Sequence, residues 1–280
     1  VGRTSTKVKS FPTTHSRTGA LMSTQANNDG TVGKALSVLD LVADFGRPVR
    51  FSEILENSNQ PKATLYRFLQ TLTNQRLLSY EAERQTYSLG MRLVGLAHLA
   101  WKQSSLAPIA RPFLDKLSAA TGETTHLAQL DNGQVLYVDK CNAKNPVDMY
   151  SQAGKVGPGY CTGVGKAIMA FLPKEKQERA LRQQAYFQFT EKTHLNAATL
   201  RDELDVIAET GFSYDREEHE AGIICIAVPI LTKNKRVLGG ISITSTTTQT
   251  SLEGMDVYKS ILSETAQQIG TTAANWQFPT

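Results

Sequence analysis

Cysteine is scarce in this chain of 280 residues, which has only three of them and no Cys-x-x-Cys pair. Cys141, Cys161 and Cys225 are odd in number and far apart in the sequence. This arrangement argues against a disulfide framework and gives no cysteine-based zinc signature. It suits a reducing compartment.

Long apolar runs are also missing. The longest, at residues 222–231 and 237–243, are far shorter than the ~20 residues that a membrane helix needs. Residues 1–25 lack the apolar middle region of a secretory signal. We therefore expect a soluble, cytoplasmic protein.

Acidic residues are absent from residues 1–28, which contain four basic ones. Subtracting these four from the 30 Lys and Arg leaves 26, against 26 Asp and Glu, so the rest of the chain is neutral. The basic balance of the whole chain therefore says nothing about nucleic acid. Residues 1–28 are polar and poor in apolar side chains, which predicts a disordered tail.

Residues 29–90 show the pattern of three short helices followed by a hairpin. Apolar residues recur at helical spacing in the first helix, and the second is expected within 51–60 with Ser52 as its N-cap. The third begins at Pro61, which the first turn of a helix accepts. Apolar and polar residues alternate on both sides of a polar turn at 81–85. Three helices and a hairpin predict a winged helix-turn-helix.

Residues 91–105 continue as a helix, which we interpret as a linker that also contributes to dimerisation. Residues 106–280 mix helices and strands without strict alternation, including a hairpin with an Asn-Gly turn. Strands are expected at 147–152 and at three places within 212–244, and a final helix at 252–274. The fold class is therefore α+β, with a central antiparallel sheet in this second domain.

The exposed face of the third helix is small and polar near its start, so its backbone can approach the major groove of DNA. Lys62 and Thr64 are expected to bond phosphate oxygens. Arg67 can reach a base edge or a phosphate, and Tyr66 can cover a sugar or a thymine methyl. Arg84 lies at the wing tip. A merely solvated helix face fits the spacing equally well. The candidate DNA-binding residues are Lys62, Ala63, Thr64, Tyr66, Arg67, Thr71 and Arg84.

The segment "SNQPKATLYRFLQTLTNQRLLSYEAERQTYSLG" resembles the winged helix of the IclR family of bacterial transcriptional regulators. Its Pro-Lys-x-Thr-x-x-Arg pattern and the Tyr-x-Leu of the wing strand fall in register with the family. The chain departs from the family at Asn59-Gln60, where Gly-Leu is usual, and at Ala63, where serine is usual.

The resemblance extends over nearly everything from Thr31 onward. "SQAGKVGPGYCTGVGKAIMA", "DREEHEAGIICIAVPI" and "VLGGISITS" are similar to segments of the family's ligand-sensing domain, which has a GAF-like fold. Within the family these segments are most similar to regulators of sugar-acid catabolism such as the keto-deoxygluconate repressors. The resemblance implies a small organic acid as effector.

The glycine-rich loop "PGYCTGVGK" fails as a nucleotide-binding loop. Tyr160 stands where a Walker-type loop needs glycine, and Ala167 replaces the hydroxyl residue that would hold Mg²⁺. Small residues at a helix N-terminus still leave free amides for an anion, and the amides of Gly163 and Val164 are the expected carboxylate donors. A glycine turn needed only for helix packing fits equally well. Lys166 can reach a carboxylate or point to solvent.

By register with the family, the loop belongs to an effector pocket. There Ser242 and Thr244 would donate to oxo or hydroxyl oxygens, Asp215 would accept from a ligand hydroxyl, and Met149 would form an apolar wall. The implied effector-binding residues are Met149, Gly157, Gly163, Val164, Asp215, Cys225, Ser242 and Thr244.

An enzyme is the alternative from another class, either a small-molecule hydrolase or a metal-dependent enzyme that uses the second domain. Asp215, His219 and Cys225 are metal-ligand or nucleophile types. However, His219 lies among charged residues in what we expect to be an exposed loop, and His126 and His194 show no partner spacing. We therefore expect no catalytic site, metal or cofactor.

Together with the family resemblance, the sequence predicts a ligand-responsive regulator, a repressor rather than an activator, of a carbohydrate-acid or organic-acid catabolic operon. Its expected partners are double-stranded operator DNA and a small organic-acid effector. Paired half-sites on DNA require a symmetric homodimer. The resemblance adds a tetramer, formed by two dimers, as a further assembly.

Overall fold

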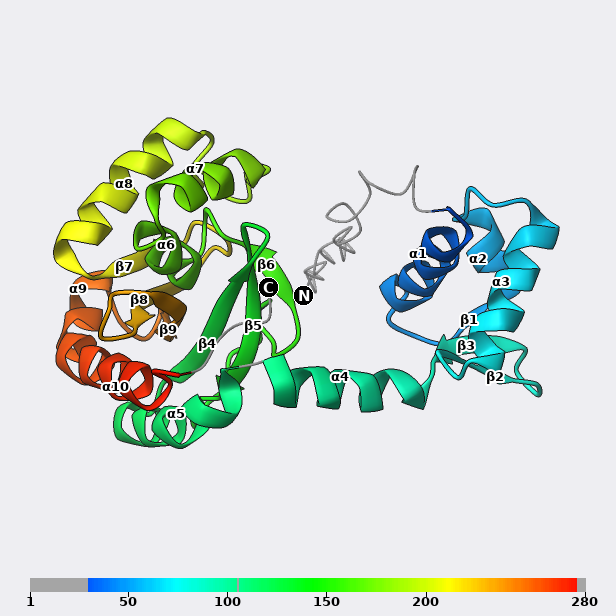
Figure 1. The fold of residues 1–280 in the computed structure, drawn as a ribbon, viewed down its shortest axis with the longest axis horizontal. Coiled ribbons are helices and arrows are strands. Elements are labelled where there is room, and N and C mark those ends of the chain that lie inside the picture. Colours follow the sequence, from blue (N-terminus) through cyan, green and yellow to red (C-terminus); the bar gives the residue numbers. More distant parts are fainter. Residues whose placement is uncertain (1–29, 105, 276–280) are drawn as a thin grey trace, which may run out of the picture. The chain divides into compact units, whose positions relative to one another are not determined.

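The computed structural model describes residues 30–104 and 106–275, so the predicted tail at 1–28 lies outside the described residues. The chain divides into two compact units, 1–99 and 100–280. The boundary falls inside helix α4 (Met91–Ser104), the predicted linker (Figure 1). No helix of the described ranges is both long and apolar enough to cross a bilayer.

The first unit is a winged helix-turn-helix, as predicted. Its three strands form an antiparallel sheet in the order β1-β3-β2, and apolar residues of α1, α3 and the sheet make one core. The two-residue β1 was not predicted, because so short a strand has no alternation to detect. The elements are α1 (Gly30–Asp44), β1 (Val49–Arg50), α2 (Phe51–Glu56), α3 (Lys62–Asn74), β2 (Leu78–Glu81) and β3 (Thr86–Leu89).

The predicted N-cap of α2 was wrong. The helix begins at Phe51 with Arg50 as N-cap, so Ser52 already lies inside the helix. The reason is the Glu53 carboxylate, which accepts from the backbone N–H of Arg50 at 3.0 Å and also pairs with the side chain of Arg47. A glutamate at the third helical position thus fixes the start of α2.

The junction between the wing and α4 depends on one glycine. The N–H of Gly90 donates to the carbonyl of Leu77 at 2.8 Å, and a Cβ at Gly90 would lie 2.2 Å from the carbonyl oxygen of Arg76. The Arg92 side chain then donates to the carbonyl and the side-chain oxygen of Gln75, both at 3.0 Å. The start of α4 is therefore fastened to the end of α3.

The second unit is an α+β domain around a six-stranded antiparallel sheet with strand order β6-β5-β4-β9-β8-β7. Helices α5 and α10 cover one face over a large apolar core, and α6 lies on the other face with α7 and α8 behind it (Figure 1). The helices are α5 (Ala107–Thr121), α6 (Gly163–Ala170), α7 (Lys174–Gln183), α8 (Ala197–Thr210), α9 (Leu252–Met255) and α10 (Lys259–Thr272). The strands are β4 (Thr124–Asp131), β5 (Gln134–Cys141), β6 (Val156–Pro158), β7 (Ser213–Arg216), β8 (Ile223–Leu231) and β9 (Val237–Thr246).

Most of the predicted elements are confirmed, including the hairpin turn at Asn132 and Gly133, where φ is +47° and +80°. The strand predicted at 147–152 was wrong. The N–H of Tyr150 donates to the Glu220 carboxylate at 3.0 Å instead of to a neighbouring strand. The predicted final helix is interrupted, because a short 3₁₀ turn at Asp256–Tyr258 separates α9 from α10.

Candidate functional site

The recognition helix candidate, α3, is amphipathic. Leu65, Phe68, Leu69 and Leu72 are buried in the core of the first unit. The opposite face exposes the side chains that the sequence assigned to DNA contact, and only Thr64 among those on α3 is half-buried. The exposed ones are Lys62, Ala63, Tyr66, Arg67 and Thr71.

The candidate DNA-binding side chains differ in the contacts that they already make within the protein. The hydroxyl of Thr71 donates to the carbonyl of Arg67 at 2.9 Å, so its proton is not free for a phosphate. Arg84 is exposed at the wing tip, 3.7 Å from Glu81. Arg67 is exposed and forms no ion pair among the described residues. Lys62, the other cation of α3, is likewise exposed and forms no ion pair among the described residues, so both side chains remain candidates for DNA contact.

A groove of about 840 Å³ is lined by residues of α3, the start of α2 and the hairpin. Tyr66, which is 54 % exposed, forms one wall together with Lys62 and Ala63. The opposite wall contains Tyr80 and Gln85, which the sequence analysis did not single out. Their side chains face α3 only because the hairpin folds back on it, and no spacing along the chain shows this.

The glycine-rich loop leads into α6 as predicted. Thr162 is the N-cap, but its hydroxyl donates to the carbonyl of Pro158 at 2.8 Å and does not cap the helix amides. A Cβ at Gly163 would lie 2.5 Å from Cys225 Sγ, and one at Gly165 would lie 2.4 Å from the carbonyl oxygen of Gly159. The glycines are thus required for close packing, whether or not the amides also bind a ligand.

A small, partly open cavity lies between the start of α6 and the sheet. Its volume of about 30 Å³ has room for about two water molecules. Met149 and Gly157 are buried but do not line it; Gly157 packs against Tyr137, which does. Six of the eight predicted effector residues are brought together here: Gly163, Val164, Asp215, Cys225, Ser242 and Thr244.

His126 is the centre of the cavity's polar wall, although the sequence showed no partner for it. Its Nε2 lies 2.8 Å from Ser151 Oγ, and its Nδ1 lies 3.2 Å from Thr244 Oγ1 and 3.5 Å from Ser242 Oγ. Burial lowers the pKa of His126 to about 3, so the ring is neutral at physiological pH. A neutral imidazole orients hydroxyls and supplies no counter-charge for an anion.

Asp215 is the buried acid of the cavity. Burial, together with the nearby Glu218 carboxylate, raises the pKa of Asp215 to about 7, although the backbone N–H of Glu218 donates to it at 2.8 Å. Burial also raises the pKa of the Cys161 and Cys225 thiols far above their ordinary value. Thiols held neutral in this way are poor nucleophiles and poor metal ligands.

The prediction that His219 lies in an exposed loop was wrong. Its side chain is 11 % exposed, lines the cavity and packs against the rings of Tyr150 and Phe189, whose centroids lie 5.1 and 4.6 Å away. Glu220, on the same loop, also lines the cavity. The charged neighbours of His219 in the sequence gave the wrong impression because the loop folds back onto the sheet.

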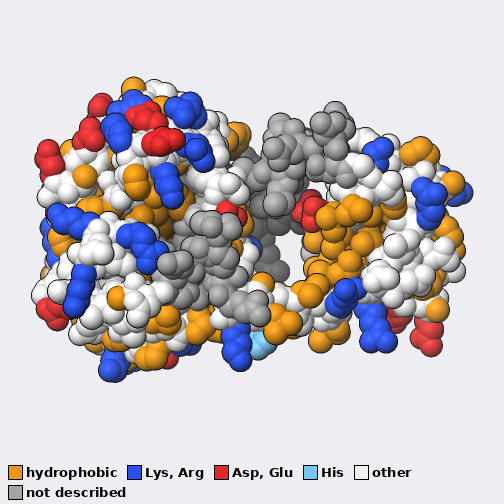
Figure 2. Space-filling model, viewed as in Figure 1, with side chains coloured by type: hydrophobic (Ala, Val, Ile, Leu, Met, Phe, Trp, Pro, Cys, Tyr) orange, Lys and Arg blue, Asp and Glu red, His pale blue; other side chains and the backbone are white. Residues whose placement is uncertain are grey.

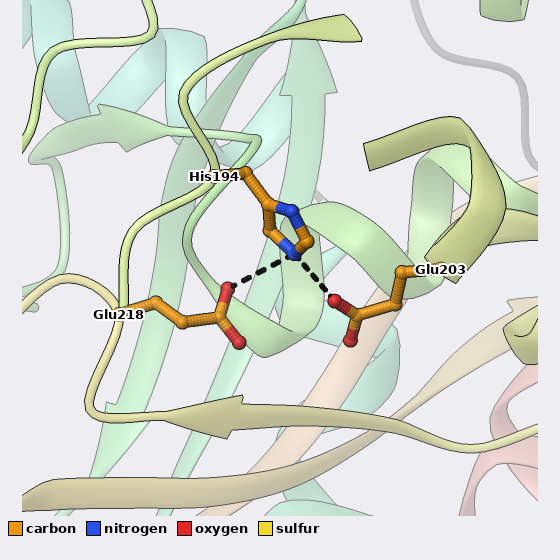
Figure 3. A group of neighbouring side chains, drawn as sticks. All are labelled: His194, Glu203 and Glu218. Atoms are coloured by element: carbon orange, nitrogen blue, oxygen red, sulfur yellow. Dashed lines mark hydrogen bonds and ion pairs between the residues drawn. The ribbon is translucent and has the colours of Figure 1, made fainter. Parts of the chain in front are cut away.

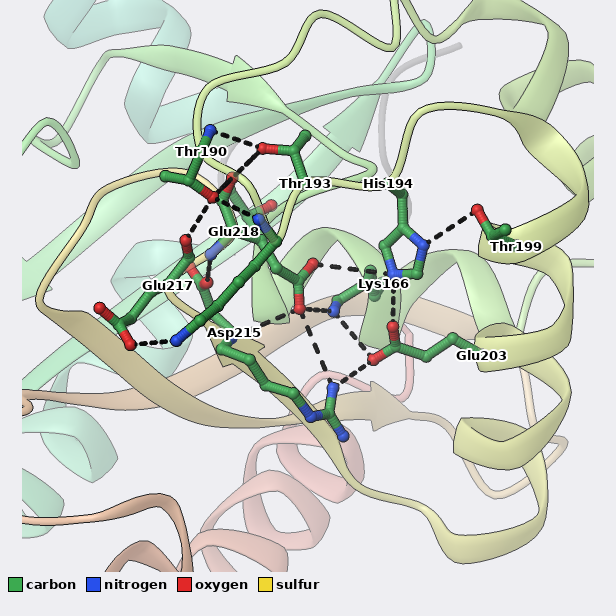
Figure 4. A network of polar contacts seen from close by, with 12 residues as sticks. Lys166, Thr190, Thr193, His194, Thr199, Glu203, Asp215, Glu217 and Glu218 are labelled. Atoms are coloured by element: carbon green, nitrogen blue, oxygen red, sulfur yellow. Dashed lines mark hydrogen bonds and ion pairs between the residues drawn. The ribbon is translucent and has the colours of Figure 1, made fainter.

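Lys166 neither faces solvent nor lines the cavity. Its side chain is fully buried, and its Nζ donates to Glu203 Oε1 at 2.9 Å and to Glu218 Oε1 at 2.5 Å (Figure 4). Burial opposes its charge, but the two glutamates outweigh burial and raise the pKa of Lys166. Glu203 Oε1 also forms an ion pair with Arg216, whose Nη1 lies 2.7 Å away. The lysine is therefore committed to a buried ionic network behind the cavity.

Comparison with known proteins agrees with this architecture. The helix-turn-helix domain model of the IclR family matches residues 31–82, and the model described as bacterial transcriptional regulator IclR C-terminal matches residues 98–271. The chain belongs to the IclR family. Its members and this chain share both units, so this protein is a helix-turn-helix transcriptional regulator.

Several IclR-family proteins resemble the chain along most of its length. The transcriptional regulator KdgR of Escherichia coli K12 is 31% identical over 251 residues, which are 89% of this chain and 95% of KdgR. The solved IclR structure of Thermotoga maritima has a TM-score of 0.71 and 29% identity, covering 86% of this chain and 97% of that one. An IclR homologue from Microbacterium hydrocarbonoxydans, solved with 4-hydroxybenzoate, has a TM-score of 0.73 at 22% identity, covering 88% and 100%, and shows the shared fold.

The relatives also bear on the alternative from the enzyme class. KdgR is a transcriptional regulator, and both units of the chain match domains of such regulators. The hydrolase or metal-dependent enzyme is therefore not favoured. The similarity to KdgR confirms the resemblance inferred from the segments of the second unit.

Proposed function

We propose that this IclR-family regulator binds operator DNA in the cytoplasm through α3 and the wing, and acts as a repressor of an organic-acid catabolic operon. A small carboxylic acid in the cavity at the start of α6 would control it. The observation that carries the effector proposal is the cavity itself, which is lined by the first residues of α6 and by a wall of hydroxyls and a neutral histidine.

The DNA-binding proposal rests on the exposed face of α3 and the groove beside it. Lys62 and Arg67 supply positive charge, and Tyr66 supplies an apolar surface for a sugar or thymine methyl. Arg84 at the wing tip extends the contact to the backbone or minor groove. The wing and α3 thus offer phosphate and base contacts from two directions.

The apolar side chains left exposed on the first unit support the proposal of a homodimer. Figure 2 shows apolar side chains gathered over α1 and along α4. Val32 of α1 is 71 % exposed, and Met91 and Val94 of α4 are 79 % and 60 % exposed. Burying such residues against a second copy gains about 25 cal/mol per Å² of apolar surface. A tetramer would need a further contact through the second units.

The effector proposal is narrowed by the chemistry of the cavity. Amides of Gly163 and Val164 suit a carboxylate, while Ser242 and Thr244, oriented by His126, suit oxo or hydroxyl oxygens. We propose an oxo or hydroxy acid, with a sugar acid first in line because of the similarity to KdgR. Because a homologue was solved with 4-hydroxybenzoate, aromatic acids are also candidate effectors to be tested.

The small volume of the cavity places a condition on effector binding. About 30 Å³ is too small for any of these acids, so binding requires the lining side chains to move outward. His219 and its neighbours Tyr150 and Phe189 lie on three separate loops and not on strands, so we expect this side of the cavity to open. Effector binding therefore reshapes the segment between β7 and β8.

Arg67→Ala tests the DNA proposal. Against duplex fragments from the region upstream of the gene, the wild type should bind with an affinity that falls as salt rises, and the variant should bind about 10- to 100-fold more weakly. Fluorescence anisotropy measures both, and the exposed Arg179→Ala on α7 is the control. Equal affinities of the Arg67 variant and the wild type would remove α3 from the interface.

A thermal-shift panel of sugar acids, oxo acids and aromatic acids tests the effector proposal, because a ligand stabilises the fold it binds. We expect the midpoint to rise with an oxo or sugar acid, and the same acid to alter operator affinity. A rise with aromatic acids alone would contradict the sugar-acid assignment.

A further inference from the structure

A cluster of one histidine and two glutamates lies beside the effector cavity. His194 comes from the loop before α8, Glu203 from α8, and Glu218 from the segment between β7 and β8 (Figure 3). One ligand atom of each lies within 4.8 Å of the others. His194 Nε2 is 2.5 Å from Glu203 Oε2 and 3.9 Å from Glu218 Oε2.

One oxygen of this cluster is unsatisfied. Glu218 Oε2 is buried and accepts no hydrogen bond from any described residue, although the side chain is only 3 % exposed. A buried carboxylate oxygen without a partner is costly, more so than a neutral group. Figure 3 shows it directed toward the ring of His194, at a distance too long for a hydrogen bond. A cation between the two groups would satisfy it.

The cations already present occupy the other side of the glutamates. Lys166 contacts Oε1 of both Glu203 and Glu218 (Figure 4). Arg216 contacts Oε1 of Glu203. The two Oε2 atoms are left facing His194. Lys166 cannot supply the missing contact without giving up the two it has, because it is fully buried between the Oε1 atoms.

We propose that His194, Glu203 and Glu218 form a binding site for a divalent transition-metal ion, with Zn²⁺ as the best fit. One imidazole and two carboxylates are a ligand set that Zn²⁺ accepts. Bonds of about 2.0–2.1 Å in a tetrahedral arrangement place ligand atoms roughly 3.3 Å apart. Glu203 therefore moves slightly away from His194 and Glu218 slightly toward it, each by less than about 1 Å.

Charge and exposure define the rest of the site. Lys166 and Arg216 already balance the two glutamates, so a bound Zn²⁺ leaves an excess of positive charge and favours hydroxide or another small anion as its remaining ligand. The side chains of His194 and Glu203 are each 16 % exposed, which opens the cluster to solvent from their side. Zn²⁺ can then bind without unfolding the domain.

The proposed metal would hold three segments together. The hydroxyls of Thr190 and Thr193 already donate to the carbonyls of Glu217 and Glu218, which fastens the loop of His194 to the segment after β7. The N–H of Glu218 donates in turn to Asp215 in the cavity wall. Zn²⁺ would thus stiffen the wall that has to move for an effector, and effector affinity would depend on zinc.

The test is isothermal titration of the chelator-treated full chain, without a histidine tag, with ZnCl₂. We expect one Zn²⁺ per chain in the wild type. His194→Gln should weaken binding by about 100-fold or more, because even changes outside the ligand set cost 10- to 100-fold. His98→Gln, which replaces an exposed histidine of α4, is the matched control. No titratable zinc in the wild type, or equal binding by His194→Gln and the wild type, would overturn the proposal.

A second arm separates this cluster from the effector cavity, where Asp215, His219 and Cys225 also lie near one another. Co²⁺ bound by His194 and two glutamates should give a visible spectrum without thiolate charge transfer, and Cys225→Ser should keep the metal. A thiolate band, or loss of metal in Cys225→Ser alone, would place the ion in the cavity and refute the site proposed. These outcomes do not depend on whether the chain binds DNA or an organic acid.

Discussion

The two units carry their functional charges in opposite ways. On α3 of the first unit, Lys62 and Arg67 are exposed and surrounded by solvent, whereas in the second unit Lys166 is fully buried between two glutamates. An exposed cation contributes little to stability and is free to meet a polyanion. A buried cation costs desolvation and is tied to its partners. The exposed cations of α3 are therefore available to a binding partner, whereas the buried Lys166 holds segments of its own unit together.

The largest effect is expected from Lys166→Met, which removes the buried cation and leaves Glu203 and Glu218 with the more exposed Arg216 to balance them. The free energy of unfolding of the second unit should fall by roughly 3–5 kcal/mol. Urea unfolding followed by tryptophan fluorescence measures it, since the ring N–H of Trp101 donates to the carbonyl of Val138 in that unit at 3.0 Å. Lys62→Met is the matched control on α3 and should change stability by less than about 0.5 kcal/mol. If both variants lost a similar amount of unfolding free energy, the buried and the exposed lysine would not differ in their contribution to stability.

A smaller effect is expected from Gly163→Ala. The added Cβ would lie 2.5 Å from Cys225 Sγ, so α6 has to shift from the sheet at a cost of about 1–3 kcal/mol. Effector response should disappear while operator binding by the first unit persists. Operator binding with and without the effector found in the panel decides this. A variant that responds normally would show that the glycine serves packing alone.

The smallest effect concerns pH. The pKa of Asp215 is raised from its ordinary value to about 7 by burial, so its stabilising contribution is complete in acid, below the pKa of the unfolded chain, and is lost as pH rises through 7. Between pH 6 and 7 the loss amounts to about 1 kcal/mol. The difference in unfolding free energy between wild type and Asp215→Asn should follow this slope. A difference that is flat over this interval would mean that Asp215 titrates below pH 6.

The same contrast explains what the sequence could predict. The helices and hairpin of the first unit follow from periodicities within 13 residues or fewer, as in α3, and the exposed face of α3 could be identified from the spacing of its apolar residues. The N-cap at Ser52 was wrong because a competing carboxylate, that of Glu53, lies only one residue away. Local patterns decide local structure, and they fail only where two local signals compete.

In the second unit the informative partners are distant in sequence. Ser151 lies 25 residues from His126, and Glu203 and Glu218 lie 37 and 52 residues from Lys166. No periodicity connects such pairs, so the polar wall of the cavity and the ionic network could not be found from spacing. Of the six predicted effector residues that line the cavity, Gly163 and Val164 followed from small residues at a helix N-terminus, whereas the other four came from the family resemblance. The lining residue His219 was misplaced because its charged neighbours suggested solvent.

The fastening of α4 to α3 has a mechanical consequence. With Gly90 pressed against the carbonyl of Arg76 and Arg92 bonded to Gln75, the first turn of α4 has no slack relative to the end of α3. We therefore expect a displacement of the first turn of α4 to move the end of α3 with it and not to be absorbed by bending at the junction. A side chain at position 90 would push the two segments apart and make the junction flexible. We then expect effector binding to change DNA affinity less.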